Sequence, residues 1–149
     1  MLRIIGDTYG KSFSKDINNI NIQRTSFNSV CSSNENLESF KRFVEQYIKN
    51  KDEIVILTLD SKISNAYSKF VPLFNDDKIK VINTSLPMGA MEIVIKTIVN
   101  NKDKNLDSIQ KDINKLSEIL NSCYFILSES HLWYNNMWWE KWNVNYLIL

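Results

Sequence analysis

Two short apolar runs, each followed by a polar turn and a helix-like segment, constrain the fold of this chain more than any other feature. The first run covers residues 54–59 and the second covers residues 79–82. Runs of this length between turns are typical of strands that are buried on both faces. Strands that alternate with helices form a mainly parallel sheet with right-handed crossovers. The sequence therefore predicts an α/β fold, a mainly parallel sheet with helices on both faces.

Helical spacing and turn residues predict most of the remaining elements. A capping box, in which Ser32 caps and Glu35 reaches back, begins the first long helix, and Pro72 ends the second helix near Val71. Asn105 is the expected cap of the last helix. Residues 11–33 show only weak alternation and are expected to be mostly loop. We expect strands at residues 2–5, 54–59, 79–82 and 123–127, and helices at residues 34–50, 61–70, from 86 onward, and 106–120.

Composition limits the classes of partner. The chain has 149 residues, 44% of them hydrophobic, which is enough for one compact core. Its 18 Lys and Arg are balanced by 17 Asp and Glu, so nucleic acid is a poor candidate. Cys31 and Cys123 lie far apart beside a single His, which suggests neither a disulfide framework nor a zinc site. No apolar run reaches the roughly 20 residues of a membrane span, so we expect a cytoplasmic protein. We also expect no metal and no cofactor.

A Trp-rich segment at the end of the chain differs from the rest, because all four Trp residues lie between positions 133 and 142. On a helix, Tyr134, Trp138 and Trp142 would share one face. Such a cluster is typical of core packing or of a homodimer contact. A membrane interface is less favoured, because the Lys and Arg enrichment of interfacial helices is absent. We therefore divide the chain into an α/β domain of residues 1–130 and an atypical tail of residues 131–149.

Hydroxyl and amide side chains follow the predicted strands and precede the predicted helices. Donors near a helix N-terminus suit a carboxylate or a phosphate, because the helix dipole favours an anion and each hydrogen bond is charge-assisted. The same residue types also cap helices and form turns, so both roles stay open. No nucleophile–base pair and no glycine-rich phosphate loop is visible, so we expect no catalytic residue. The candidate ligand-binding residues are Ser32, Ser33, Ser61, Ser64 and Asn65, and Thr84 and Ser85 stand in a similar place after the next strand.

Three segments show a recognisable order and spacing. Residues 60–67 read Asp-Ser-Lys-Ile-Ser-Asn-Ala-Tyr, residues 81–84 read Val-Ile-Asn-Thr and precede a Pro-Met-Gly at 87–89, and residues 123–127 read Cys-Tyr-Phe-Ile-Leu. These segments resemble a Ser-Ser-x-Leu-Ser-Gly-Thr-Tyr turn, a strand end before a Ser-Met-Gly helix start, and a late strand. The three motifs that these segments resemble all come from the amino-terminal domain of the DegV family of bacterial fatty-acid-binding proteins.

The resemblance implies a carrier that binds a long-chain fatty acid and presents its carboxylate to a separate fatty acid kinase subunit, without catalysing a reaction itself. Ser64 falls on one head-group hydroxyl of the family. The other hydroxyl comes from a Thr-Ser-x-Pro-Ser motif, which either Thr25 or Ser32 matches, and Ser32 has the better distance to the following helix and to Ser64. Asp7 and Thr8 resemble the Asp-Ser that follows the family's first strand.

The chain also departs from the family pattern. Asn65 replaces a Gly, the Gly-Gly-Arg-Ile stretch after the late strand is missing, and so is the second domain that encloses the acyl chain. One hypothesis is that the tail reads out of frame and that the chain is a truncated copy of a longer protein. Two other functions stay open. One is a small metal-dependent phosphotransferase or hydrolase that uses Asp7 or Asp60, and the other is an interaction module or non-functional remnant without a ligand.

Overall fold

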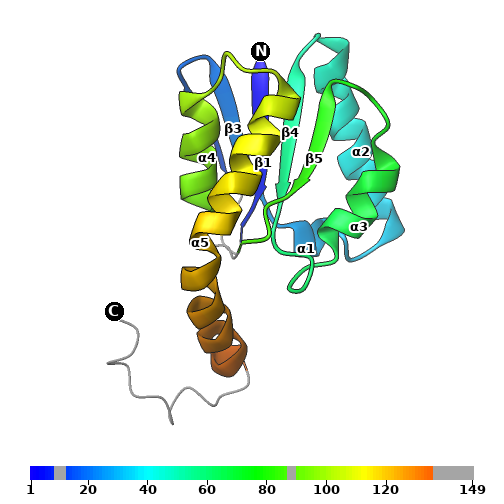
Figure 1. Ribbon diagram of the computed structural model, residues 1–149. Coiled ribbons are helices and arrows are strands. Elements are labelled where there is room, and N and C mark those ends of the chain that lie inside the picture. The colour runs from blue at the N-terminus through cyan, green and yellow to red at the C-terminus, as the bar shows by residue number, and fades with distance from the viewer. Residues whose placement is uncertain (9–12, 87–89, 136–149) are drawn as a thin grey trace.

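A mostly parallel sheet forms the centre of the protein (Figure 1). The computed structural model describes residues 1–8, 13–86 and 90–135, and from residue 121 onward it describes the main chain only. The sheet order is β2-β3-β1-β4-β5, in which β2 pairs antiparallel with β3 at one edge and all other pairs are parallel. The predicted α/β fold is therefore confirmed. The strands are β1 (Leu2–Asp7), β2 (Phe13–Ile17), β3 (Ile20–Thr25), β4 (Glu53–Thr58) and β5 (Ile79–Asn83).

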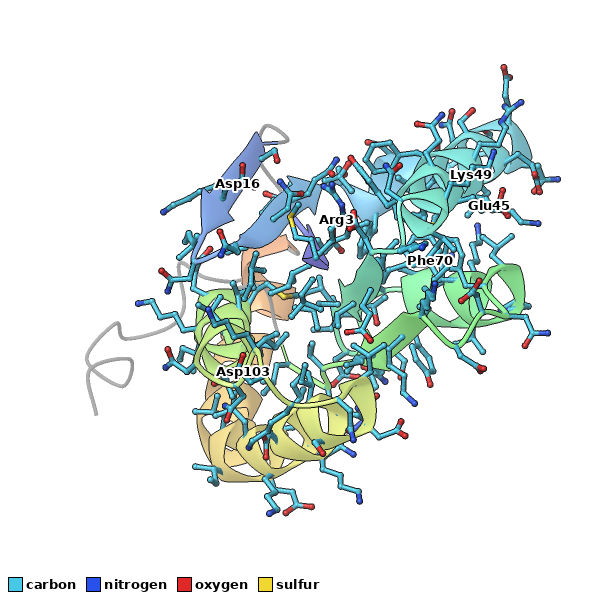
Figure 2. The ribbon with its side chains drawn as sticks, turned by 90° about the horizontal axis from the view of Figure 1, so that it is seen from above. Arg3, Asp16, Glu45, Lys49, Phe70 and Asp103 are labelled. Carbon is cyan, nitrogen blue, oxygen red and sulfur yellow. The ribbon has the colours of Figure 1, made fainter. Side chains whose placement is uncertain are left out.

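Helices cover both faces of the sheet, as Figures 1 and 2 show from two directions. One group packs against one face and contains α1, α2 and α3, and the other group contains α4 and α5. The helices are α1 (Phe27–Val30), α2 (Asn34–Lys49), α3 (Ala66–Phe70), α4 (Met91–Asn100) and α5 (Leu106–Asn135), with a 3₁₀ turn η1 (Val71–Leu73) directly after α3.

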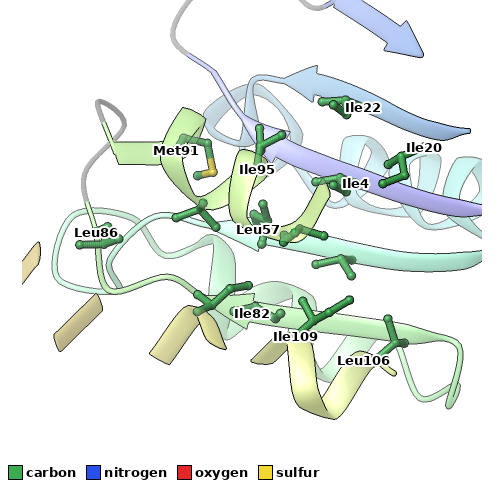
Figure 3. Packing of buried hydrophobic residues seen from close by; sticks show 14 of the residues in the cluster. Ile4, Ile20, Ile22, Leu57, Ile82, Leu86, Met91, Ile95, Leu106 and Ile109 are labelled. Carbon is green, nitrogen blue, oxygen red and sulfur yellow. The ribbon is translucent and has the colours of Figure 1, made fainter. Parts of the chain in front are cut away.

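The central strands supply two separate cores, because successive side chains of a strand point to opposite faces. In β1, Ile4 is buried in the core beneath α4 and α5, whereas Ile5 is buried in the core beneath α1, α2 and α3. Figure 3 shows the first of these cores, in which Ile4 and Leu57 lie near Ile95 of α4, and Ile82 of β5 lies near Ile109 of α5. Burial on both faces is why β4 reads as an unbroken apolar run.

Three Phe side chains join α1, α2 and α3. The ring centroids of Phe27 and Phe70 are 4.8 Å apart, those of Phe40 and Phe70 are 5.0 Å apart, and those of Phe27 and Phe40 are 5.8 Å apart. Offset and edge-to-face pairs at such distances stabilise a core beyond the area that they bury. The three helices are thus held together at the end of the sheet where the strands finish.

The segment from residue 11 to residue 33 is not mostly loop, so this prediction was wrong. It contains β2, β3 and α1, and β2 and β3 form a hairpin through Asn18 and Asn19. Both Asn residues have positive φ, 52° and 65°, as a two-residue hairpin turn of the mirror-image type requires. Asn tolerates this conformation better than most residues do, but the pair is a weaker sequence signal than Asn-Gly.

Other predicted boundaries need correction. The helix expected at residues 61–70 begins only at Ala66. The helix expected from residue 86 is seen from Met91, and residues 87–89 lie outside the described part of the chain. The strand predicted at residues 123–127 is wrong, because α5 continues to Asn135. No Gly or Pro occurs between residues 106 and 135 to end that helix.

The Trp-rich tail lies mostly outside the described residues. Residues 131–135 form the last turns of α5, and residues 136–149, with Trp138 and Trp142, are not described. The predicted aromatic face and homodimer contact therefore stay predictions. Among the described helices, none combines the length and the apolar character that crossing a membrane needs.

A largely buried ion pair lies at the amino ends of the parallel strands. Nε of Arg3 in β1 donates to a carboxylate oxygen of Asp52 at 2.6 Å, and the guanidinium lies 3.8 Å from the centroid of the Tyr47 ring. Burial by itself would raise the pKa of Asp52, but hydrogen bonds and positive charge from Arg3 and from the Met1 amino group outweigh it and lower the pKa. The charged form of Asp52 therefore stabilises the folded state.

Replacing Asp52 with Asn should lower the free energy of unfolding at pH 7 by about 1–3 kcal/mol, because it weakens a charge-assisted hydrogen bond at a buried acceptor. Since the folded-state pKa is lowered, the stabilisation is present above the unfolded-state pKa of about 3.9 and is lost as pH falls through the folded-state pKa. Urea unfolding at pH 7 and pH 3 should show the difference at pH 7 and a smaller one at pH 3. Asp103→Asn, at an exposed residue, should change neither value.

Candidate functional site

The carboxyl ends of the parallel strands meet at one edge of the sheet. Asp7 at the end of β1 pairs with Thr25 at the end of β3, and Thr58 at the end of β4 pairs with Asn83 at the end of β5. The two polar turns that follow the apolar runs therefore open to the same edge, as predicted. After β1 the chain continues toward β3 on one side, and after β4 it continues toward β5 on the other. In α/β sheets a ligand binds where the chain direction diverges in this way.

Part of this edge is fixed by buried hydroxyls. Thr58 is fully buried and its hydroxyl donates to the Ile82 carbonyl oxygen at 3.2 Å. The Thr84 hydroxyl donates to the Thr58 carbonyl oxygen at 2.9 Å, and the Ser117 hydroxyl donates to the Thr84 carbonyl oxygen. Thr84, one of the candidate residues, is only 1% exposed and serves the packing of the edge. Ser85 beside it is partly buried and has a φ of 53°, so it forms the turn after β5.

Asp7 fixes the end of β1 against α1. Its Oδ1 accepts hydrogen bonds from the backbone N–H of Thr8 at 2.8 Å and of Phe27 at 2.9 Å. Its backbone carbonyl oxygen accepts one from Nε of Arg24 at 2.7 Å. Burial raises the pKa of Asp7, against the opposing effects of the two N–H donors and of the Arg24 charge. Asp7 thus positions the start of α1.

The turn after β4 positions Ser64. The Asp60 carboxylate accepts a hydrogen bond from the Lys62 N–H at 2.9 Å, and the Asp60 carbonyl oxygen accepts one from the Ser64 N–H at 3.0 Å. The Ser64 hydroxyl oxygen accepts one from the Ala66 N–H at 3.2 Å, so its own O–H is not used. Ser61 and Asn65 are exposed on either side, and Ser64 is partly exposed.

Ser32 and Ser33 are exposed where α1 meets α2, but they differ from the predicted capping box. Ser33 is the N-cap, since its oxygen accepts a hydrogen bond from the Asn36 N–H at 3.1 Å. Ser32 instead donates to the Ser29 carbonyl oxygen at 2.7 Å and accepts from the Asn36 side-chain amide at 2.9 Å. The prediction that Ser32 caps the helix was therefore wrong by one residue, because Ser32 is used in the turn that follows α1.

Lys69 joins the two predicted head-group segments. Its Nζ donates to the Cys31 carbonyl oxygen at 2.7 Å, and that carbonyl is bonded to the nitrogen of Ser32. The Lys69 N–H donates to the Asn65 carbonyl oxygen, one helical turn earlier. Figure 1 shows α1 and α3 side by side at this end of the sheet. The Ser32–Ser33 and Ser64–Asn65 segments, which lie far apart in the sequence, are thus tethered to each other.

A pocket of about 370 Å³ opens between the end of β3, α1 and α2. Asn36, which bonds Ser32, and Ser29 lie in its wall, and the rings of Phe40 and Phe43 line its apolar part. Volumes of roughly 300–1,000 Å³ are typical of small-molecule sites. Thr25, the alternative match to the first motif, lines the same pocket. The remaining lining residues are Gln23, Val30 and Ser39.

Sequence reasoning missed Lys69, Asn36 and Phe43. Phe43 follows Phe40 by three residues and Asn36 precedes it by four, so all lie on one side of α2, a spacing that was visible. Lys69 carried no local signal, because its partner is 38 residues away in the sequence.

The carboxylates of the metal-dependent alternative both have backbone partners. Asp7 bonds the N–H of Phe27 and Asp60 bonds the N–H of Lys62. Within the described ranges, no group of three or more His, Cys, Asp or Glu side chains is placed to hold a metal ion.

Comparison of the chain with protein-family models, with curated proteins and with solved structures found no match. Its relation to a family therefore depends on the motif resemblance alone.

Replacing Asp7 with Asn tests whether its buried charge opposes folding. A raised folded-state pKa means that stability falls as pH rises from the unfolded-state pKa of about 3.9 through the folded-state value. Asn keeps the side-chain oxygen that accepts the two N–H groups but does not titrate, so this fall should disappear in the variant. Urea unfolding between pH 4 and pH 7 measures it, and a steeper fall in the variant would show that the Asp7 charge stabilises the fold through Arg24.

Proposed function

We propose that this chain binds a long-chain fatty acid, with the carboxylate at the Ser32–Ser33 and Ser64–Asn65 segments and the acyl chain in the pocket along α2. The observation that carries the proposal is the hydrogen bond from Lys69 to the Cys31 carbonyl oxygen, because it tethers the Ser64–Asn65 segment to Ser32, whose partner Asn36 lines the pocket. A polar end that continues into an aromatic wall suits an amphiphile. The motif resemblance to the DegV family supports the same ligand class independently.

The hydroxyls at the polar end suit a carboxylate. Ser33 and Ser64 both accept hydrogen bonds from backbone N–H groups, so each still has an O–H to donate. Ser32 reaches a ligand only by exchanging its bond to the Ser29 carbonyl oxygen. The N-terminus of α2 begins at Asn34 beside these residues, and the N-terminus of a long helix favours an anion. Two donors and a helix end thus support a carboxylate head group.

The aromatic wall suits the acyl chain. Phe40 is buried and stacks on Phe43, with the ring centroids 6.4 Å apart, and Phe43 is only partly buried. Covering such a surface with methylene groups gains about 0.8 kcal/mol for each CH₂ that leaves water. Ser32 and Ser33 are exposed where α1 meets α2. A head group bound there would be accessible to a separate kinase subunit, which is the presentation that the family resemblance implies.

The fatty acid should be detectable by mass spectrometry of an organic extract of the purified, folded protein. We expect a near-stoichiometric fatty acid in the natural chain and in Ser64→Thr, which keeps the hydroxyl, and a loss of most of it in Ser64→Ala. Ser108→Ala in the first turn of α5, at the opposite end of the sheet, is the matched control and should retain the ligand. An empty extract from folded natural protein, with no uptake of added oleate, would favour the interaction module or remnant instead.

The acyl part of the site can be tested separately. Phe43→Ser should reduce the amount of bound fatty acid severalfold, because a polar side chain replaces part of the apolar wall. Ile119→Ser on α5 removes a side chain that is 74% exposed and far from the pocket, so it should leave the ligand unchanged. Equal loss of ligand in both variants, or in neither, would place the acyl chain elsewhere. Thermal unfolding of each variant should accompany the extraction.

A further inference from the structure

We propose that Lys69 supplies the positive charge that makes this site select a singly charged carboxylate over a neutral lipid head, an inference that rests on the proposed function. The ammonium of Lys69 is held 2.7 Å from the Cys31 carbonyl oxygen, at the junction between the two hydroxyl segments. The Cys31 carbonyl group directly precedes Ser32 in the chain, so the ammonium lies next to the Ser32–Ser33 segment. No sequence motif pointed to this residue.

The position of the ammonium is fixed from two sides. Lys69 is in the last turn of α3, and its backbone N–H bonds the Asn65 carbonyl oxygen, so the side chain starts one turn from Asn65. The side chain is partly buried and ends on α1, where Cys31 is buried. Burial raises the pKa of the Cys31 thiol, and the positive charge of Lys69 opposes this rise. The charge is thus held in place between the segments and does not extend freely into water.

Lys69 has capacity left for a ligand. A lysine ammonium has three N–H donors, and one of them is used on the Cys31 carbonyl oxygen. Within the described residues no carboxylate forms an ion pair with Lys69. Two acidic residues are close in sequence to the hydroxyls. The Asp60 carboxylate accepts a hydrogen bond from the Lys62 N–H, and Glu35 is exposed in the first turn of α2. A partly buried cation without an acidic partner suits an anion.

The charge also limits the kind of anion. A carboxylate carries one negative charge, which a single ammonium balances, and it accepts several hydrogen bonds at once. A fatty alcohol would use the same hydroxyls but gain nothing from the charge. The ratio of the affinities for two lipids with the same acyl chain therefore measures the effect of the Lys69 charge separately from the effect of the pocket.

Equilibrium binding of oleate and of oleyl alcohol to the delipidated full chain tests the inference. Lys69→Met should weaken oleate binding about tenfold more than oleyl alcohol binding, because loss of the Cys31 hydrogen bond affects both lipids, whereas loss of the charge-assisted contact affects oleate alone. Lys69→Arg keeps the charge and a donor for the Cys31 carbonyl oxygen, so it should retain most of the oleate affinity. Lys62→Met is the matched control, because Lys62 is an exposed lysine in the neighbouring turn, and it should bind both lipids as the natural chain does.

Each other outcome has a definite meaning. Equal weakening of both lipids in Lys69→Met would show that Lys69 only holds the two segments together, and would overturn the inference. Unchanged oleate binding in that variant would also overturn it and leave the proposed function standing. A natural chain that binds neither lipid would remove the proposed function and this inference together. Thermal unfolding of Lys69→Met distinguishes a local effect from a loss of fold, and Lys69→Arg provides a folded reference.

Discussion

Burial of β1 and β4 on both faces is the constraint on which the rest of the structure depends. Ile4 and Ile5 serve opposite cores, and the run from Ile54 to Leu57 is buried throughout. A strand buried in this way must lie inside a sheet with helices on either side, and parallel pairing then follows from the helical connections. Parallel pairing in turn brings the polar turns after the strands to one edge. The candidate site is therefore a consequence of how the apolar runs are packed.

The polar groups at that edge fall into two sets that burial separates. Thr58, Thr84 and Asp7 are buried and bonded to the main chain, and they fix the loops. Ser33 and Ser64 are more accessible and accept hydrogen bonds without donating one. The first set holds the loops at this edge in place, and the second set has hydroxyl donors that no other group in the described residues uses. Residue type alone does not show which of these hydroxyls are buried and which are accessible.

The sequence was sufficient to predict the parallel strands and the long helix α2, since their apolar patterns are strong. The prediction failed where the structure depends on an unusual turn sequence or on a contact between residues that are far apart in the sequence. The hairpin was missed because Asn18 and Asn19 form its turn in place of Asn-Gly. An apolar run such as residues 123–127 fits a buried strand and a helix equally well, and only the surrounding chain without Gly or Pro favours α5. For the candidate site, the sequence indicated the hydroxyl residues, whose role stays a prediction, whereas the Lys69 contact joins residues 38 apart and had no sequence signal.

The two edges of the sheet are chemically unequal. β2 exposes Lys15 and Asp16 at the antiparallel edge, and charges on an edge strand discourage pairing with a further strand. β5 at the other edge has one charged residue, Lys80, and its ammonium is paired with Asp107 at 2.8 Å. Among the described strands β5 pairs only with β4, so its outer main-chain groups face away from the sheet. The antiparallel edge is therefore better protected against pairing with a further strand than the β5 edge is.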